Sequence, residues 1–275
     1  MQKRFITPED KFQYFFGYYD LQPYDETNEK HLVHRVKFLD REPTAEDIAE
    51  LGYVKDGTFF KISETTSWNF QQGSMMQWYE SGKSVIFNDF DGKGYISRVV
   101  GIDGKEIDEY DCPFATINFK SGKAVSVNFS RIYDFRRGYG YCNIPDPFAN
   151  VNAPDDDNLM IYSGLPEWGI YFFNVTTGER RRLNDPLCDH NDIHCNYSPD
   201  RKSFIGDGYP YNDMRSIYYY DFTDKKSKEL IKVYSSPVND IDIRCDLHAR
   251  WSKDGKRISY DTTEDGNRRV AEIIL

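Results

Sequence analysis

Residues 248–261 read HARWSKDGKRISYD, and the pattern of this stretch decides the fold. A short strand-like run comes first, a polar turn ending in Gly255-Lys256 follows, and a second, more apolar run closes the segment. Three further segments align with it, at residues 76–89, 115–128 and 194–207, and a weaker copy lies at residues 24–38. A polar turn between two such runs is typical of a β-hairpin, and its recurrence indicates a repeat architecture.

A second, more aromatic hairpin follows each copy of the repeat. These hairpins lie at residues 58–63, 95–110, 169–183, 216–234 and 268–275. Two hairpins make a four-stranded blade, so the sequence predicts an all-β protein, a β-propeller of five four-stranded blades, with residues 1–275 as a single domain. Residues 18–20 are expected to lend a strand to the last blade and so close the ring. The alternative is an open two-sheet β-sandwich, which does not explain the repeated turn.

Two segments stand outside the repeat. The widest interval separates the copies at residues 115–128 and 194–207, and it holds a stretch rich in proline and aspartate. We expect a long loop inserted there, at about residues 131–159, and loops of that length are usually functional or disordered. The only helix that the sequence predicts covers residues 44–51, with Thr44 as its N-cap and Asp47 three residues later.

The composition limits the classes of partner. Aromatic residues make up 16% of the 275 residues, which favours strands, because Tyr and Phe suit pleated, half-buried surfaces. The net charge is −10, so nucleic acid, which needs a basic face, is not an expected partner, whereas a few arginines could still bind an acidic sugar. We expect no membrane association, because the chain has neither a signal segment nor a long apolar run. The five widely spaced cysteines suit free thiols in the cytoplasm.

His194 and His248 are the first candidates for chemistry. Each lies eight residues before the turn lysine of its repeat, so we expect the two side chains to lie side by side at one mouth of the central channel. Strand periodicity places Asn196 and Arg250 on the same faces as these histidines, and Gln72 occupies a matching place in another blade. The alternative is that both histidines cap strands and bond to neighbouring backbone.

Carboxylates and metals are the next candidates. Asp207, Asp213 and Asp261 lie on or after the second strands of their repeats, which by this register places them away from the histidines and disfavours a hydrolase with paired carboxylates. The Cys and His spacings do not match a structural zinc site. A manganese-like ion held by His194 and His248 together with Gln or Asn is the more plausible metal site.

Arginines and tyrosines gather in a second group, at residues 128–141. Arg131, Arg137, Tyr139 and Tyr141 surround two glycines there. Arginine binds a carboxylate by two parallel hydrogen bonds, and tyrosine can move a proton when a nearby cation lowers its pKa. The alternative is an aromatic loop packed on one face of the propeller.

Residues 66–78 form a third group. Alternation along this stretch sends Trp68, Phe70 and Gln72 to one face. Two large aromatic rings usually pack between blades, whereas Gln72 beside Gly73 could reach the channel.

Several of these strings resemble a group of bacterial propeller proteins, the oligogalacturonate lyases and, more distantly, the ulvan lyases. The strings are WNFQQG at 68–73, NFSR at 128–131, RGYGY at 137–141, HCNYSPD at 194–200 and RCDLHARWS at 244–252. The resemblance covers most of the chain from about residue 14, and such relatives usually have seven blades.

The resemblance implies β-elimination on a uronate, in which a base removes the proton next to the carboxylate and an acid protonates the leaving oxygen. Carried over by motif, His194 and His248 would hold a divalent metal such as manganese or transfer protons. Arg131, Arg137 and Tyr139 would bind the carboxylate or move a proton. The other expected substrate contacts are Gln72, Asn196, Arg250, Tyr141 and Trp68.

One string departs from the lyase pattern. Where these lyases carry Gln-x-x-His-x-His, this chain has Cys245-x-x-His248-x-Arg250. The leading hypothesis is a cytoplasmic propeller that binds acidic oligosaccharides or acts on them as a lyase. The alternative is a non-catalytic propeller that binds a carbohydrate or a protein partner across one face.

Overall fold

The computed structural model describes residues 1–147, 171–174, 176–183, 185, 194–238 and 240–275. These residues form four four-stranded antiparallel sheets and two two-stranded sheets. Their helices are short: α1 (Phe129–Phe135), η1 (Glu80–Gly82) and η2 (Arg137–Tyr139). None of them has the length and hydrophobicity that a membrane-spanning helix needs.

Each four-stranded sheet is a meander of hydrogen-bonded neighbours. The β2–β5 blade contains β2 (Gln13–Phe15), β3 (His31–Val36), β4 (Ala49–Lys55) and β5 (Thr58–Thr65). The β6–β9 blade contains β6 (Gln77–Tyr79), β7 (Ser84–Phe90), β8 (Tyr95–Gly101) and β9 (Glu106–Tyr110). The β14–β17 blade contains β14 (Asn196–Tyr197), β15 (Ser203–Asp207), β16 (Met214–Asp221) and β17 (Lys226–Tyr234). Successive four-stranded meanders are the blades of a β-propeller, so the chain is an all-β propeller, as predicted.

The two remaining hairpins were expected to form one blade together. They are β10 (Thr116–Asn118) with β11 (Lys123–Val125), and β12 (Tyr171–Phe173) with β13 (Arg180–Arg182). Within the described residues each hairpin is a separate two-stranded sheet. Part of the loop predicted at 131–159 is helical, in α1 and η2, and residues 148–159 lie outside the described residues.

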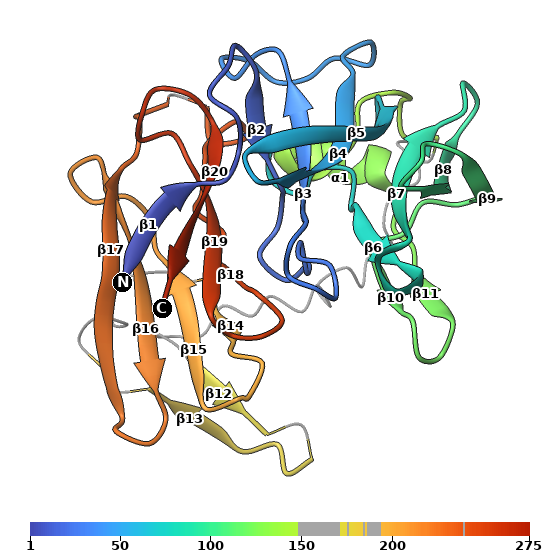
Figure 1. The fold of residues 1–275 in the computed structure, drawn as a ribbon. Coiled ribbons are helices and arrows are strands. Elements are labelled where there is room, and N and C mark those ends of the chain that lie inside the picture. The colour runs from blue at the N-terminus through green and yellow to red at the C-terminus, as the bar shows by residue number, and fades with distance from the viewer. Residues whose placement is uncertain (148–170, 175, 184, 186–193, 239) are drawn as a thin grey trace.

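The fourth four-stranded sheet joins the two ends of the chain. The β18–β1 blade contains β18 (Arg250–Trp251), β19 (Arg257–Thr262), β20 (Arg269–Ile274) and β1 (Gln2–Phe5), and Figure 1 shows β1 beside β20. The closing strand is therefore β1, and the prediction that residues 18–20 supply it is wrong. The register pairs Arg4 with Glu272, and the two side chains form an ion pair at 2.6 Å.

A repeated polar contact joins each blade to the unit that follows it. Near the end of the second strand of each blade, a buried side chain accepts a hydrogen bond from a backbone N–H of the next blade or hairpin. Asp207 accepts from Ala249 at 3.4 Å, Asp261 from Phe16 at 3.4 Å, Asn88 from Phe114 at 2.9 Å, and Nε2 of His34 from Ser74 at 3.0 Å. Because a buried N–H needs a partner, this inter-blade contact explains Asn88, Asp207 and Asp261 near the ends of three aligned segments. Asn128, at the end of the fourth, caps α1 instead.

The predicted helix at residues 44–51 is wrong, and the reason is local. Thr44 and Asp47 do bond reciprocally, through Thr44 N to the Asp47 carboxylate and Asp47 N to the Thr44 carbonyl. The chain turns only once, however, and enters β4 at Ala49. Among the described residues the α-helix is α1, which was predicted as loop, and the side chain of Asn128 caps it by accepting from Arg131 N.

Candidate functional site

Two histidines from neighbouring blades lie against each other just before their innermost strands. His194 precedes β14 and His248 precedes β18, and their ring centroids are 4.8 Å apart at an interplanar angle of 69°. Both stand opposite the last residues of the second strand, since His194 N bonds to the Asp207 carbonyl and Asp261 N to the Leu247 carbonyl. The side-by-side position that the spacing predicted is what the structure shows.

The Nδ1 atom of each ring is held by an acceptor. His194 Nδ1 lies 3.4 Å from Asp207 Oδ2, and His248 Nδ1 lies 3.1 Å from the carbonyl oxygen of Gly17. A carbonyl only accepts, so His248 carries its proton on Nδ1, and Nε2 is buried without a partner among the described residues. Burial lowers the pKa of His248 to about 3, so this ring is neutral at neutral pH.

Asp207 completes an imidazole–carboxylate pair with His194. Burial alone would raise the pKa of Asp207, but the hydrogen bond and the charge of His194, with a contribution from His248, outweigh it and lower that pKa. The carboxylate is therefore ionised and orients the His194 ring through Nδ1. The prediction that Asp207 lies away from the histidines is wrong, because the residues just before β14 pair with the end of β15 and bring His194 to Asp207. The side chain of Asp261 contacts Phe16 N and Arg250 instead.

Two tyrosines cover the histidine pair. The ring of Tyr18 lies 4.9 Å from His248 and 6.0 Å from His194, and the ring of Tyr19 lies 5.0 Å from His194. Tyr139 packs edge-on against Tyr18 at 5.9 Å. Burial raises the pKa of Tyr139, and burial followed by Tyr139 raises that of Tyr18, so both phenols stay protonated.

Tyr18 and Tyr19 were missed by the sequence reading. They follow Gly17, whose φ of +124° and close approach to the Gln72 carbonyl (2.7 Å from an added Cβ) leave no room for a side chain. A glycine before two tyrosines at the end of an innermost strand is the signal that would have found them.

A cationic group stands beside these rings. Asp246 is buried and accepts from Arg215 Nη1 at 2.7 Å and from Arg244 Nε and Nη2 at 2.8 and 2.9 Å. Burial would raise the pKa of Asp246, but the two arginines and His248 lower it well below its usual range. Arg244 is 16% exposed and stacks on Tyr209 at 4.7 Å, so its guanidinium is held at the edge of the site. The sequence reading did not single out Arg244.

The predicted arginines are held by acidic partners. Arg131 bonds to the buried Asp146 at 2.8 Å, and Arg137 is 61% exposed and 3.5 Å from Glu42. Arg250 is fully buried. It bonds to Asp261 at 3.0 Å and to the Gly17 carbonyl at 2.6 Å. Arg250 therefore shares the Gly17 carbonyl with His248. Arg131 anchors α1 to Asp146.

The other predicted contacts divide into two groups. Asn196 donates to the Tyr19 carbonyl at 2.9 Å, and Gln72 packs its backbone on Gly17, so both lie next to the histidine pair. Trp68 is buried and donates to the Asp47 carbonyl at 2.8 Å. Tyr141 is buried too, and its hydroxyl accepts from Asn88 at 3.1 Å. The last two side chains belong to the packing between elements.

The described residues do not form a complete manganese site around the histidines. The Nδ1 contact of each ring suits a metal ligand, because a carboxylate or a carbonyl orients the imidazole. Within the described part of the chain, however, the only group of three side chains close enough to share an ion is Glu42, Asp240 and Asp242. That group is half-buried, and Arg137 pairs with its Glu42.

The chain was compared with known proteins. No family model and no curated protein matches it. It is similar to an oligogalacturonate lyase from Vibrio parahaemolyticus, with 12% identity over 99% of this chain and 93% of that chain, at a TM-score of 0.43. It is also similar to TolB from Acinetobacter baumannii, with 16% identity over 90% of this chain and 51% of that chain, at a TM-score of 0.30. It is also similar to the AtxE2 isopeptidase, with 10% identity over 98% of this chain and 53% of that chain, at a TM-score of 0.47.

This chain therefore spans about half the length of the TolB and AtxE2 chains. At these identities and TM-scores the comparisons carry no conclusion about function, and the assignment of the fold rests on the sheets of the chain itself. Fold and site together define a β-propeller with a cluster of histidine, tyrosine and arginine at one end of its innermost strands.

Proposed function

We propose that the cluster around His194 and His248 binds an acidic oligosaccharide and cleaves it by β-elimination next to a uronate carboxylate. The observation that carries the proposal is the His194–Asp207 pair. Its carboxylate holds Nδ1 of an imidazole that is 18% exposed, so part of the ring can contact a bound sugar. His248, which is fully buried, supports this ring rather than meeting substrate.

The residues of the site supply each part of the reaction. Nε2 of His194 takes the proton from the carbon that bears the carboxylate, and the electron pair of that C–H bond forms a double bond as the C–O bond to the next sugar breaks. The leaving oxygen takes a proton from a protonated tyrosine, for which Tyr139 and Tyr18 are the candidates. Charge builds up on the carboxylate in the transition state, and Arg244 is the cation placed to stabilise it.

The variant pair His194→Ala and Arg131→Gln tests this proposal. Each protein is mixed with oligouronates, and the near-ultraviolet absorbance of the new conjugated double bond is followed. His194→Ala should lower the rate by ~10²–10⁴-fold, the usual contribution of a general base. Arg131→Gln changes a predicted residue that lies outside the cluster, so its rate should stay close to that of the unchanged protein. Equal rates in all three proteins would refute the assignment of the site.

A second function remains open, the non-catalytic binding of an acidic sugar. Tyr18 and Tyr19 lie against the imidazoles, and such ring faces bind sugars without chemistry. Titration of the protein with the same oligouronates separates the two functions. Binding without any rise in absorbance, in protein that is folded by circular dichroism, favours the binding function.

A further inference from the structure

A large cavity lies at the other end of the propeller from the histidines. It has a volume of about 860 Å³ and lies between the β6–β9 blade, the β10–β11 hairpin and turns of two other blades. Glu26, Ser81, Gly122 and Lys253, which line it, all belong to or adjoin the turns after the innermost strands. His194 and His248 precede those strands, so the cavity is distinct from the site described above. A ligand bound in this cavity would be separate from the substrate of the proposed function.

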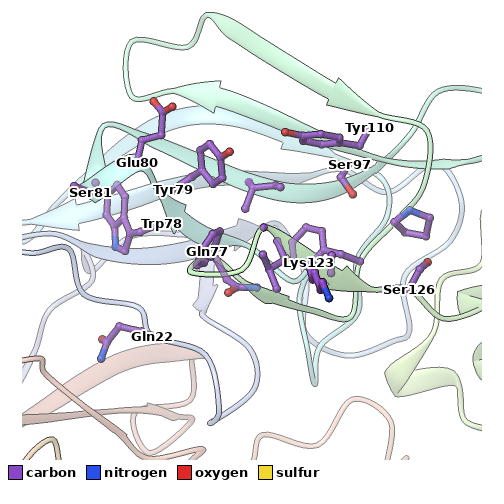
Figure 2. A pocket seen from close by; sticks show the side chains of 18 of the residues that line it. Gln22, Gln77, Trp78, Tyr79, Glu80, Ser81, Ser97, Tyr110, Lys123 and Ser126 are labelled. Atoms are coloured by element: carbon purple, nitrogen blue, oxygen red, sulfur yellow. The ribbon is translucent and has the colours of Figure 1, made fainter.

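The walls of this cavity are mainly apolar. Trp78, Tyr79, Tyr110, Phe114, Ile117 and Phe119 line it, and Figure 2 shows the rings of Tyr79 and Tyr110 on one side. Hydrogen bonds to Tyr79 and then to Asp108 raise the pKa of Tyr110 to about 12, so the two phenols satisfy each other and present ring faces. Cavities of ~300–1,000 Å³ with apolar walls and a few placed polar groups are typical of small-molecule sites.

Two hydrogen-bond donors in the cavity lack a partner. Gln77 Nε2 is buried and has no acceptor among the described residues. Lys123 is exposed, lines the cavity, and forms no ion pair within the described part of the chain. Lys253, by contrast, is paired with Glu26 at 2.5 Å. A buried amide N–H without an acceptor costs free energy, and a ligand that brings an acceptor recovers it.

We infer that this cavity binds a small amphipathic anion, with an apolar ring body between the aromatic walls and an acidic head on Gln77 and Lys123. Lys123 offers only N–H donors, and the group of Gln77 without a partner among the described residues is its amide N–H, so together they favour an acceptor. Of the described residues that line the cavity, Glu26 and Glu80 carry carboxylates. Glu26 is paired with Lys253, and Glu80 points away from Gln77 and Lys123 in Figure 2, so it does not oppose the charge of the head.

Two fluorescent probes of matched shape test the inference. Anilinonaphthalene sulfonate carries an aromatic body with an acidic head, and N-phenylnaphthylamine has the same body without the head. The fluorescence of each probe rises in an apolar cavity, and titration gives its dissociation constant. We expect the anionic probe to bind more tightly than the neutral one, since a charge-assisted bond contributes ~1.5–3 kcal/mol, about tenfold or more.

Three variants and one control locate the binding. Gln77→Glu and Lys123→Met should each weaken the anionic probe by about tenfold and leave the neutral probe almost unchanged. Ile117→Trp fills the cavity and should weaken both probes. Lys120→Met, at an exposed lysine of the same hairpin that does not line the cavity, should change neither.

Three results would overturn the inference. They are an absence of anionic-probe binding at millimolar concentration, binding that Ile117→Trp leaves intact, and a Lys120→Met effect equal to that of Lys123→Met. Activity on oligouronates plays no part in this test, so its outcome is independent of the proposed function.

Discussion

One carboxylate, that of Asp207, serves both the fold and the site. Its Oδ2 lies 3.4 Å from Nδ1 of His194, while its Oδ1 lies 3.4 Å from the backbone N–H of Ala249 in the next blade. The same inter-blade contact exists in other blades, where Asn88 or His34 makes it. In the β14–β17 blade the structural contact therefore also orients the ring that we assign as the base.

The variant Asp207→Asn separates the two roles. An asparagine keeps the Oδ1 acceptor for Ala249, as Asn88 does for Phe114, so the free energy of unfolding should change little. Its amide N–H would face His194 Nδ1 and favour the tautomer with the proton on Nε2, which cannot act as base. The elimination rate should fall by ~10³–10⁴-fold, as with an imidazole in the wrong tautomer. A stable variant with an unchanged rate would contradict the role given to Asp207.

Asp261 gives a stability prediction without a catalytic part. It accepts from Phe16 N and pairs with the fully buried Arg250 at 3.0 Å. Asp261→Ala leaves a buried cation unpaired and should cost ~3–5 kcal/mol in the free energy of unfolding, measured by urea denaturation. Asp261→Asn keeps the acceptor for Phe16 and should cost less than the alanine variant. Equal losses in the two variants would show that the acceptor for Phe16 N does not contribute.

Arg244 gives a prediction about substrate recognition. Arg244→Gln removes the cation at the edge of the site, whereas Asp246 keeps its bond to Arg215. We expect binding of an acidic oligosaccharide to weaken by about tenfold, and that of its methyl-esterified form to change little. Calorimetric titration with both ligands measures the difference. The assignment fails if both forms lose affinity equally.

The buried histidines His31 and His34 should make the free energy of unfolding depend on pH. Burial lowers the pKa of His31 and of His34 from 6.5 to about 3. The unfolded chain therefore binds more protons than the folded chain between these values, and the free energy of unfolding falls as the pH drops from 6.5 towards 3. At about one pH unit below 6.5, each histidine should contribute a loss of about 1.4 kcal/mol.

The variant His34→Asn isolates one of these contributions. Asparagine can accept from Ser74 N as Asn88 accepts from Phe114 N, so folding should persist. The free energy of unfolding is measured against pH by urea titrations between pH 5 and pH 7. The slope of this curve should decrease by the contribution of one histidine. An unchanged slope would mean that His34 does not titrate as a buried neutral ring.

Parts of the fold and the site followed from the sequence because they depend on local patterns. The hairpins follow from turn chemistry, and the position of His194 beside His248 follows from equal spacing to the turn. The burial of Arg250 did not follow from spacing, because its partners lie far away in the sequence. They are Asp261 on the next strand and the Gly17 carbonyl in another blade. Sequence spacing does not show which arginines already have a partner.

The errors have similar causes. Thr44 and Asp47 form a true capping contact, but a strand in the β2–β5 blade begins two residues later and ends the turn. Asp207 was expected away from His194 because it ends the second strand, but the antiparallel pairing brings that end beside the residues that precede β14. Which side chains meet at strand ends depends on the register of the strands, which the spacing of the repeat does not give.

Elimination chemistry at His194 is tested by the near-ultraviolet absorbance of oligouronate solutions after addition of the unchanged protein. We expect a rise for acidic substrates that is lost in His194→Ala. The absence of a rise with every oligouronate tried, in protein that is folded and binds them, would contradict the elimination chemistry and leave sugar binding as the function of the site.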